Sequence, residues 1–230
     1  PQGIEIDGGE GVGRVPKAGL DQPVGAAAIN STPRRMITEA VAAVCSECGY
    51  FGGIRITISI PEGAALAQKT FNPRIGIVGG LSVIGTTGIV EPMSNAALVD
   101  TIRLELSVLS AGGAEGVLLC PGNYGEDFSR DVLRLSMKRQ VSVSNFIGDG
   151  IEAAVSYGFK RILLVGHIGK LVKLGIGAHN THSAYGDGRM ETLIACALEC
   201  GADVDLLREI LNCVTTDAAL QAIDQRGLLE

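Results

Sequence analysis

Between residues 74 and 169, four short apolar runs alternate with stretches whose apolar residues recur at helical spacing. Each run ends at a glycine-bearing turn, and these turns are Gly79-Gly80, Pro121-Gly122-Asn123, Ile147-Gly148-Asp149 and Gly166-His167. Short buried strands separated by helices indicate parallel strands with right-handed crossovers. We therefore predict an α/β fold in which residues 71–230 form a doubly wound, mostly parallel, Rossmann-like sheet domain with a C-terminal helical cover.

Residues 1–70 follow a different pattern and predict a separate α+β domain. Thr32 is expected to cap a helix that has Pro33 at its first position and ends at Gly49. From Ile54 to Ile60, isoleucines alternate with polar residues, which predicts a half-buried strand.

The four glycine-bearing turns are expected to line one crevice, because ligands of doubly wound sheets bind beyond the carboxyl ends of the strands. The first turn continues into a loop of glycines and hydroxyls, whose small side chains let the backbone approach a ligand and donate hydrogen bonds. The candidate binding residues in these turns are Gly79, Gly80, Ser82, Gly85, Gly88, Gly122, Asn123 and Asp149. Thr86 and Thr87 are candidates for contact with the reacting groups.

Two familiar nucleotide-binding motifs do not fit this chain. The dinucleotide motif needs glycines spaced one and then two residues apart, and the first loop has another spacing. The phosphate-binding loop fails around Gly169-Lys170, where Leu164 and Leu171 occupy positions that require Gly and Ser or Thr. The sequence therefore favours neither NAD nor ATP.

Charge and composition limit the partners of the chain. Nineteen basic and 25 acidic side chains give a net charge of −6, which argues against a nucleic-acid partner. No apolar run approaches the roughly 20 residues that a membrane helix needs, so no membrane span is expected. Six cysteines without a signal sequence favour a reducing, cytoplasmic location.

All three histidines, His167, His179 and His182, lie within sixteen residues. His179 and His182 would face the same way if their segment were helical, with Asp187 close behind. Three roles stay open for this cluster: contact with a substrate, structural hydrogen bonds, or a metal site. Asp187 could instead cap a helix over residues 189–200.

Several segments, taken together and in order, resemble the cobalt-precorrin-5B methyltransferases of anaerobic cobalamin biosynthesis. The two most specific are NPRIGIVGG at residues 72–80 and GTTGIVEPMS at residues 85–94. The others are GVGRV (11–15) with KAGL (17–20), AIN (28–30) with PRRMI (33–37), GHIGKLVK (166–173) and HNTHS (179–183). A Thr-Gly and Cys-Ala-rich segment typical of that family is absent and the chain starts on Pro1, so we expect it to be part of a longer protein.

The resemblance implies a reaction, a cofactor and a substrate. A methyl group would pass from S-adenosylmethionine to carbon 1 of cobalt-precorrin-5B, giving cobalt-precorrin-6A, with cobalt present only within the substrate and no protein-bound metal. The corrinoid substrate is wide and anionic, so a cleft between the two domains that binds it would need cations and hydrogen-bond donors. The candidate substrate-binding residues are Arg34, Arg35, Arg74, Lys170, His179, Asn180 and Arg189, and His167 and His182 join Thr86 and Thr87 as catalytic candidates.

Two other functions stay open. One is a nucleotide-dependent oxidoreductase on the same kind of sheet, and the other is a corrinoid-binding module without turnover. The sequence also leaves both a monomer and a homo-oligomer open.

Overall fold

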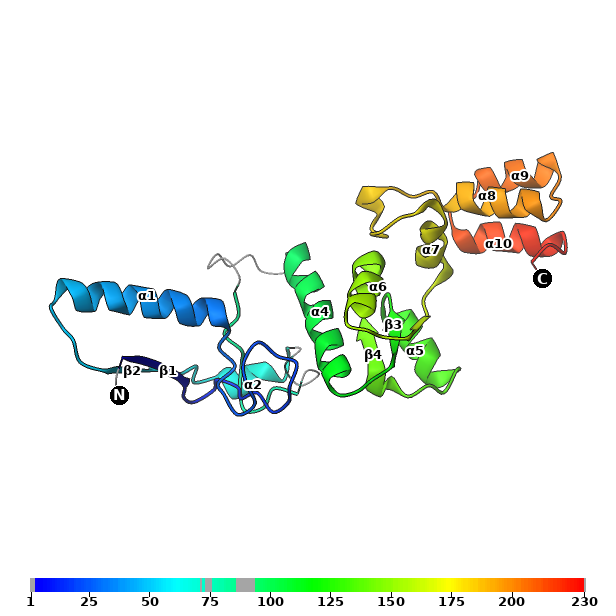
Figure 1. Cartoon of the computed structure of the whole chain (residues 1–230). Coiled ribbons are helices and arrows are strands. Elements are labelled where there is room, and N and C mark those ends of the chain that lie inside the picture. The colour runs from blue at the N-terminus through cyan, green and yellow to red at the C-terminus, as the bar shows by residue number, and fades with distance from the viewer. Residues whose placement is uncertain (1–2, 71, 73–75, 86–93, 230) are drawn as a thin grey trace. The chain divides into compact units, whose positions relative to one another are not determined.

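A computed structural model describes residues 3–70, 72, 76–85 and 94–229, and Figure 1 shows the order of the elements along the chain. The chain forms two compact units, Pro1–Ala114 (unit 1) and Glu115–Glu230 (unit 2). The sequence led us to expect a boundary near residue 70. The units divide later because Val78, Leu81 and Val83 form β-bridges with residues between 12 and 29, which ties this segment to unit 1.

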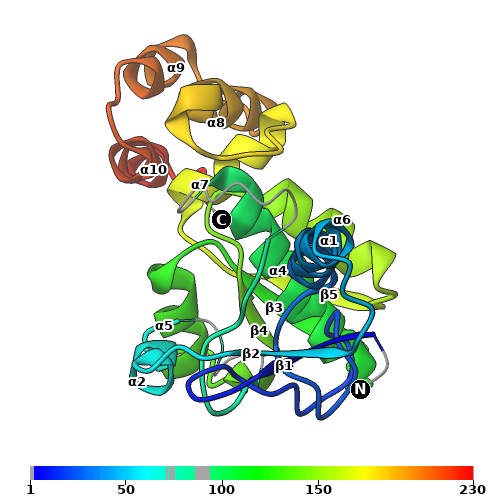
Figure 2. The same cartoon turned by 90° about the vertical axis from the view of Figure 1, so that its left-hand side faces the viewer.

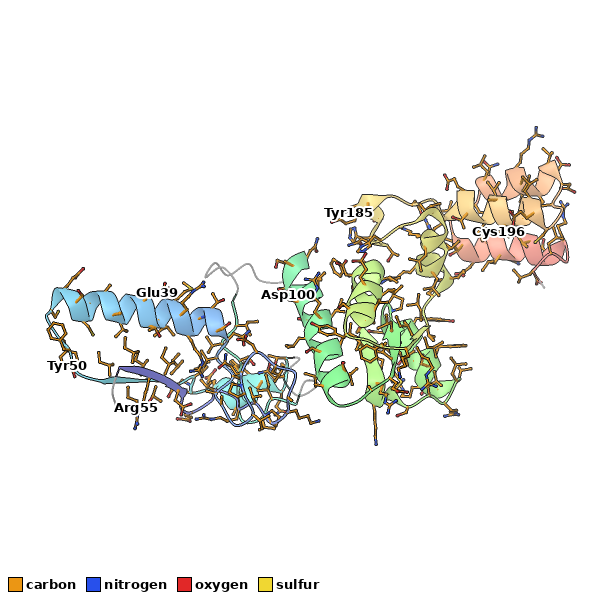
Figure 3. The ribbon with its side chains drawn as sticks, in the orientation of Figure 1. Glu39, Tyr50, Arg55, Asp100, Tyr185 and Cys196 are labelled. Carbon is orange, nitrogen blue, oxygen red and sulfur yellow. The ribbon has the colours of Figure 1, made fainter. Side chains whose placement is uncertain are left out.

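Unit 1 begins with a parallel pair of strands joined by a long helix. The strands are β1 (Ile4–Gly8) and β2 (Ile54–Ile58), in a register that pairs Ile4 with Ile54, and the connecting helix is α1 (Ser31–Glu47). Arg55 of β2, labelled in Figure 3, reaches Glu5 of the neighbouring strand at 3.0 Å. The expected helix and strand are thus present, although α1 begins one residue before Thr32 and its N-cap is Asn30.

The rest of unit 1 packs around two small apolar clusters. A short helix, α2 (Gly63–Ala67), follows β2, and a long one, α4 (Asn95–Ala111), ends the unit. Ser94 caps α4 by accepting a hydrogen bond from the Ala97 amide. One cluster joins Val15, Ala28 and Ile77 to α4, and the other contains Val12, Ala27 and Ile29.

Unit 2 contains a three-stranded parallel sheet in the order β4-β3-β5. Its elements are β3 (Gly116–Cys120), α5 (Asn123–Asp131), the 3₁₀ helix η1 (Met137–Arg139), β4 (Gln140–Ser142), α6 (Ile147–Ser156) and β5 (Arg161–Leu164). The mixed α/β class and three of the four expected strands are confirmed. The described residues of the fourth, near Ile77, lie in unit 1 instead.

The chain changes direction across this sheet. From β3 it crosses to β4 on one side, and from β4 it crosses back over β3 to β5 on the other. Right-handed crossovers in opposite directions put their helices on opposite faces, and Figure 1 shows α5 and α6 on the two sides of the sheet. The switch in direction therefore lies between the turns that follow β3 and β5.

The C-terminal part of unit 2 is helical. It contains α7 (Ile168–Leu171), η2 (Val172–Ile176), η3 (Ser183–Tyr185), α8 (Arg189–Glu199), α9 (Val204–Leu211) and α10 (Thr216–Gln225). Figure 2 shows α8, α9 and α10 gathered together. They share a core that includes Leu193, Leu206 and Ile223, so these helices pack on one another. Within the described residues, no helix combines the length and the apolar character that a membrane span requires.

Candidate functional site

The two turns at the switch point of unit 2 are pressed together without room for side chains. A Cβ atom on Gly125, in the first turn of α5, would overlap the carbonyl oxygen of Val165 at the end of β5. A Cβ atom on Gly166 would overlap the ring of Pro121 after β3. The two turns are therefore in direct contact and form one continuous floor at the carboxyl edge of the sheet.

Lys170 places a half-buried amino group over this floor. Its Nζ lies 3.4 Å from the carbonyl oxygen of Ser144, and a Cβ atom on Gly122 would be 3.7 Å from it. Burial lowers the pKa of Lys170, and no acidic side chain among the described residues pairs with it. Gly122 caps α5 without a side-chain hydrogen bond. A cation and helix-terminal amides near it suit the carboxylate or phosphate oxygens of a ligand.

The turn after β4 adds two unusual features to the same edge. Ser144 has a φ of 49°, a left-handed conformation that side-chain-bearing residues rarely adopt. The next residue, Asn145, accepts a hydrogen bond from the backbone N–H of Thr181 at 2.9 Å. The Thr181 hydroxyl is buried and finds no hydrogen-bond partner within the described residues. Strained backbone and unpaired polar groups of this kind are concentrated at functional sites.

His179 and Asp149, predicted as a substrate and a cofactor contact, pair with each other. The His179 ring packs on Gly148, where a Cβ atom would overlap it. Its Nδ1 lies 3.5 Å from Asp149 and its Nε2 3.1 Å from Glu152, both on α6. In the part of the chain that the structure describes, no group of three His, Cys, Asp or Glu side chains could hold a metal ion.

The other two histidines each cap a short helical segment. His167 Nδ1 accepts a hydrogen bond from Gly169, and its ring meets Tyr124 edge-on at 5.1 Å. His182 Nδ1 accepts one from Ala184. Because Nδ1 is the acceptor, each neutral ring carries its proton on Nε2, and the Nε2 of His167 lies 3.8 Å from the Asp217 carboxylate. His179 and His182 do not lie on one helix, so their expected shared face is absent.

Most of the predicted cationic contacts are already engaged. Arg34 donates to the backbone carbonyls of Ile29, Ile6 and Ala27, which fixes the start of α1. Arg35 lies 3.8 Å from Glu39 on the exposed face of α1.

In unit 2, Arg189 forms hydrogen bonds with Asp187, which also lies 3.6 Å from Lys173. This ion pair corrects the expected capping role of Asp187, since the N-cap of α8 is Gly188. The Asn180 side-chain oxygen accepts a hydrogen bond from the His182 amide.

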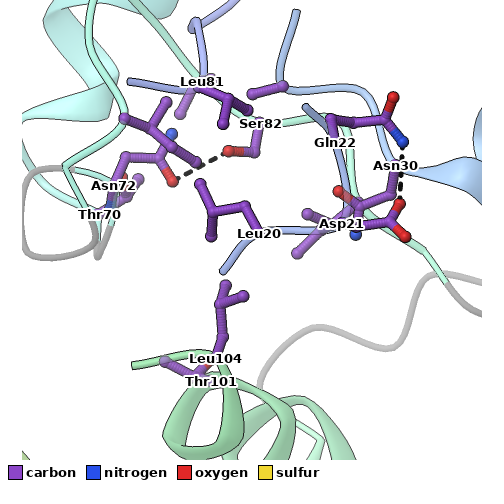
Figure 4. Close-up of a pocket in the computed structure, with 14 residues that line it drawn as sticks. Leu20, Asp21, Gln22, Asn30, Thr70, Asn72, Leu81, Ser82, Thr101 and Leu104 are labelled. Atoms are coloured by element: carbon purple, nitrogen blue, oxygen red, sulfur yellow. Dashed lines mark hydrogen bonds between the residues drawn. The ribbon is translucent and has the colours of Figure 1, made fainter. Parts of the chain in front are cut away.

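A second candidate site is a cavity of about 220 Å³ in unit 1, shown in Figure 4. Ser82, a predicted binding residue, lies on its wall and donates to the Asn72 side chain at 3.2 Å. Asn72 in turn donates to the carbonyl of Gly80 at 3.0 Å. Gly80 packs against the backbone of Gly11, where a Cβ atom would overlap it. Gly79 and Gly85 have positive φ angles of 86° and 155°.

Asp21 lies on the same cavity wall. Burial opposes its ionisation, but hydrogen bonds from the Ser31 amide, the Gln22 side chain and the Ser31 hydroxyl hold the pKa of the carboxyl below its ordinary value. Asp21 is therefore a carboxylate at neutral pH.

The structure separates the predicted site residues into two groups. Gly79, Gly80, Ser82 and Gly85 belong to unit 1, whereas Gly122, Asn123, Asp149, His167 and Lys170 belong to unit 2. Arg74, Thr86, Thr87 and Gly88 lie outside the described residues. Sequence reasoning missed Asp21, Ser144 and Thr181. Of these, only Thr181 lay inside a segment that the sequence had singled out.

Two family models match the chain. The model described as CbiD matches residues 1–92, and the model described as CbiD, C-terminal domain, matches residues 180–230. Together they match more than half of the chain.

The chain is also similar to several proteins named cobalt-precorrin-5B C(1)-methyltransferase. The one from Photorhabdus laumondii is 48% identical over 98% of this chain and 59% of its own length. Those from Ruminiclostridium cellulolyticum and a Thermoanaerobacter species are 46% and 47% identical, over 98% and 99% of this chain and 59% and 61% of their own lengths. The chain thus spans about three fifths of the length of these curated relatives.

A solved structure, described as the cobalamin biosynthesis protein (cbiD) from Archaeoglobus fulgidus, is 26% identical to the chain. The match covers 86% of this chain and 58% of that one, with a TM-score of 0.32.

Proposed function

Because the chain belongs to the CbiD family, we propose that it transfers a methyl group to carbon 1 of cobalt-precorrin-5B, giving cobalt-precorrin-6A in cobalamin biosynthesis. One observation carries this proposal: identity of 46–48% over nearly the whole chain to proteins that bear the name of this activity. S-adenosylmethionine is the proposed methyl donor, and cobalt enters only with the substrate.

The proposed reaction asks little covalent chemistry of the protein. S-adenosylmethionine supplies a methyl group that is already activated on a sulfonium, and the enamine-like carbon 1 of the macrocycle is the nucleophile. The chain's own residues then have to hold donor and acceptor in line, exclude water and stabilise developing charge. Glycine-rich turns, as at Gly122 and Gly85, let the backbone approach a ligand closely and are suited to that task.

We propose that Lys170 binds a carboxylate arm of the corrinoid. Among the predicted cations that the structure describes, Arg34 donates to backbone carbonyls, and Arg35 and Arg189 lie near carboxylates, whereas Lys170 lies near a carbonyl only. An incoming carboxylate would supply the negative charge that the half-buried amino group lacks. His167 stays a predicted contact, because its Nδ1 accepts from Gly169 and its Nε2 lies 3.8 Å from the Asp217 carboxylate.

The remaining site assignments stay proposals of the same kind. His182 is proposed to contact the reacting groups together with Thr86 and Thr87, and the donor contacts expected of Asn123 and Asp149 stay predictions. A Rossmann-like relationship of the unit 2 sheet is proposed from its β4-β3-β5 order and its switch point. We also propose a cytoplasmic location, which the free state of all six cysteines supports.

The activity is tested by incubating the chain with S-adenosylmethionine and cobalt-precorrin-5B and analysing the corrinoid by mass spectrometry. The expected result is a gain of one methyl group on the corrinoid that depends on both reactants. A corrinoid that binds to the chain but gains no mass would support a binding module instead. A change in the oxidation state of the corrinoid when NAD is added would support an oxidoreductase.

The role of Lys170 is tested by comparing Lys170→Met with Lys138→Met. Lys138 is an exposed residue of η1, which leads into the amino end of β4, at the opposite edge of the sheet from Lys170. We expect Lys170→Met to weaken corrinoid binding about tenfold, the loss of one charged contact, and Lys138→Met to leave it unchanged. Equal affinities of the two variants would refute the assignment.

A further inference from the structure

The unit 1 cavity is lined by apolar side chains with polar groups at two places. Leu20, Leu81 and Leu104 are among the apolar residues that face it, as Figure 4 shows. Asn72 and Ser82 form one polar group, joined by their hydrogen bond. Asp21 with Gln22 forms the other, and Leu20 lies between the two polar groups in Figure 4.

The size of the cavity restricts what can enter it. At about 220 Å³, the cavity is a little smaller than the roughly 300–1,000 Å³ typical of small-molecule sites, so it suits part of a small ligand and not a tetrapyrrole macrocycle. An apolar wall with a few convergent polar groups is the usual lining of a small-molecule site.

The Asp21 carboxylate has little hydrogen-bonding capacity left for a ligand. An ionised carboxylate offers about four acceptor positions, and the Ser31 amide, the Ser31 hydroxyl and the Gln22 side chain use three of them. An ammonium group would bring three N–H donors to this place and leave most of them unsatisfied. A sulfonium has a positive charge but no N–H, so it suits a carboxylate whose acceptor positions are largely used.

We infer that the unit 1 cavity binds the methyl donor and that Asp21 faces its sulfonium centre. The inference rests on the proposed function, which supplies a sulfonium ligand, and it names the acidic partner of that charge. Leu20 and Leu104 contact the donor's apolar parts, and the Asn72–Ser82 pair offers hydrogen bonds to its heteroaromatic or hydroxyl groups. The positive charge of Arg34 adds a smaller lowering of the Asp21 pKa to that of the hydrogen bonds from Ser31 and Gln22.

The test compares two ligands that differ by this charge. S-adenosylmethionine carries the sulfonium, whereas S-adenosylhomocysteine carries a neutral thioether and keeps the same amino acid and nucleoside parts. Calorimetric titration of each ligand into the chain is carried out with the wild type and with Asp21→Asn, which keeps a side-chain carbonyl for the Ser31 amide. We expect Asp21→Asn to weaken S-adenosylmethionine binding about tenfold and S-adenosylhomocysteine binding less than twofold.

Two further variants complete the experiment. Glu47→Gln removes the same charge from the far end of α1, sixteen residues from Ser31 and about 24 Å along the helix, and should change neither affinity. Ile84→Trp enlarges a cavity residue that is 68% exposed, and it should weaken both ligands without disturbing the core, whether or not Asp21→Asn folds.

The outcomes separate this inference from the proposed function. Equal losses for both ligands in Asp21→Asn, or no loss for either, would overturn the role of Asp21 while donor binding by the wild type still supports the methyltransferase. Unchanged binding of both ligands by Ile84→Trp would exclude the unit 1 cavity. Failure of the wild type to bind S-adenosylmethionine would overturn the inference together with the proposed function.

Discussion

Replacing Gly125 with Ala should separate the two turns that form the floor of the unit 2 crevice. The added Cβ atom would overlap the Val165 carbonyl oxygen and lie 3.0 Å from its carbonyl carbon and 3.2 Å from the Cα of Gly166. All three obstructing atoms are backbone, so no side chain can rotate away. The end of β5 would have to move, or α5 would have to start later.

The expected cost follows from two opposing effects. Overpacking of this kind costs about 1–3 kcal/mol, and the rigid backbone puts Gly125→Ala near the upper end of that range. Ala is favoured over Gly inside a helix by about 1 kcal/mol, which offsets part of the cost. We therefore expect a net loss of about 2 kcal/mol in the free energy of unfolding.

Urea unfolding followed by far-UV circular dichroism measures this loss, since the chain has no Trp to report by fluorescence. With a denaturant slope of roughly 1–3 kcal/mol/M, 2 kcal/mol lowers the unfolding midpoint by about 1 M. Gly116→Ala in β3 is the matched control, because its Cβ would lie 3.6 Å from the nearest atoms of Arg161, an ordinary contact. Equal midpoints for the two variants would refute the close contact of the turns.

Three further changes test individual groups. Thr181→Val removes a buried hydroxyl that has no partner among the described residues, and it should raise the free energy of unfolding by about 1 kcal/mol. Thr192→Val loses a hydrogen bond to the Gly188 carbonyl and should lower the free energy of unfolding; urea titration of both variants measures the difference. Lys170→Met should leave stability at pH 7 equal or higher. Burial lowers the pKa of Lys170 below its ordinary 10.5, so the unfolded chain binds that proton more tightly than the folded chain does. The stability of the wild type should therefore rise with pH between the folded pKa and 10.5. Urea midpoints measured across this range should rise less in Lys170→Met than in the wild type. Ser94→Ala should cost about 1 kcal/mol through loss of the α4 cap, and an unchanged urea midpoint would contradict that cap.

Local features of the fold could be predicted from the sequence. Ser94 as a helix cap and the alternating strand from Ile54 depend on residues within a few positions of each other. The helix after β3 ends at Asp131, and Arg134, three residues further on, has a φ of 54°. A single left-handed residue of this type leaves no signal in the hydrophobic pattern.

Features that depend on distant parts of the chain could not be predicted. The glycine-rich segment was expected to follow a strand of the main sheet, but Val78 and Leu81 bridge to Arg14 and Val12 through isolated pairs that have no periodic pattern.

The segment around His179 and His182 is also held from a distance, by hydrogen bonds between Thr181 and Asn145 and between Gly148 and His179. Asp21 was missed because its main partner, Ser31, lies ten residues away. Lys170 was predicted as a cation, but the absence of an acidic partner among the described residues is visible only in the structure.

The close backbone packing at Gly125 and Gly166 also affects the rate of ligand binding and the conformational entropy that binding loses. A floor held by backbone against backbone keeps its shape before a ligand arrives, so association loses little conformational entropy there. The free and liganded forms should therefore superpose closely over residues 121–125 and 165–166. Conformational changes on ligand binding should be confined to the side chains above them, mainly Lys170.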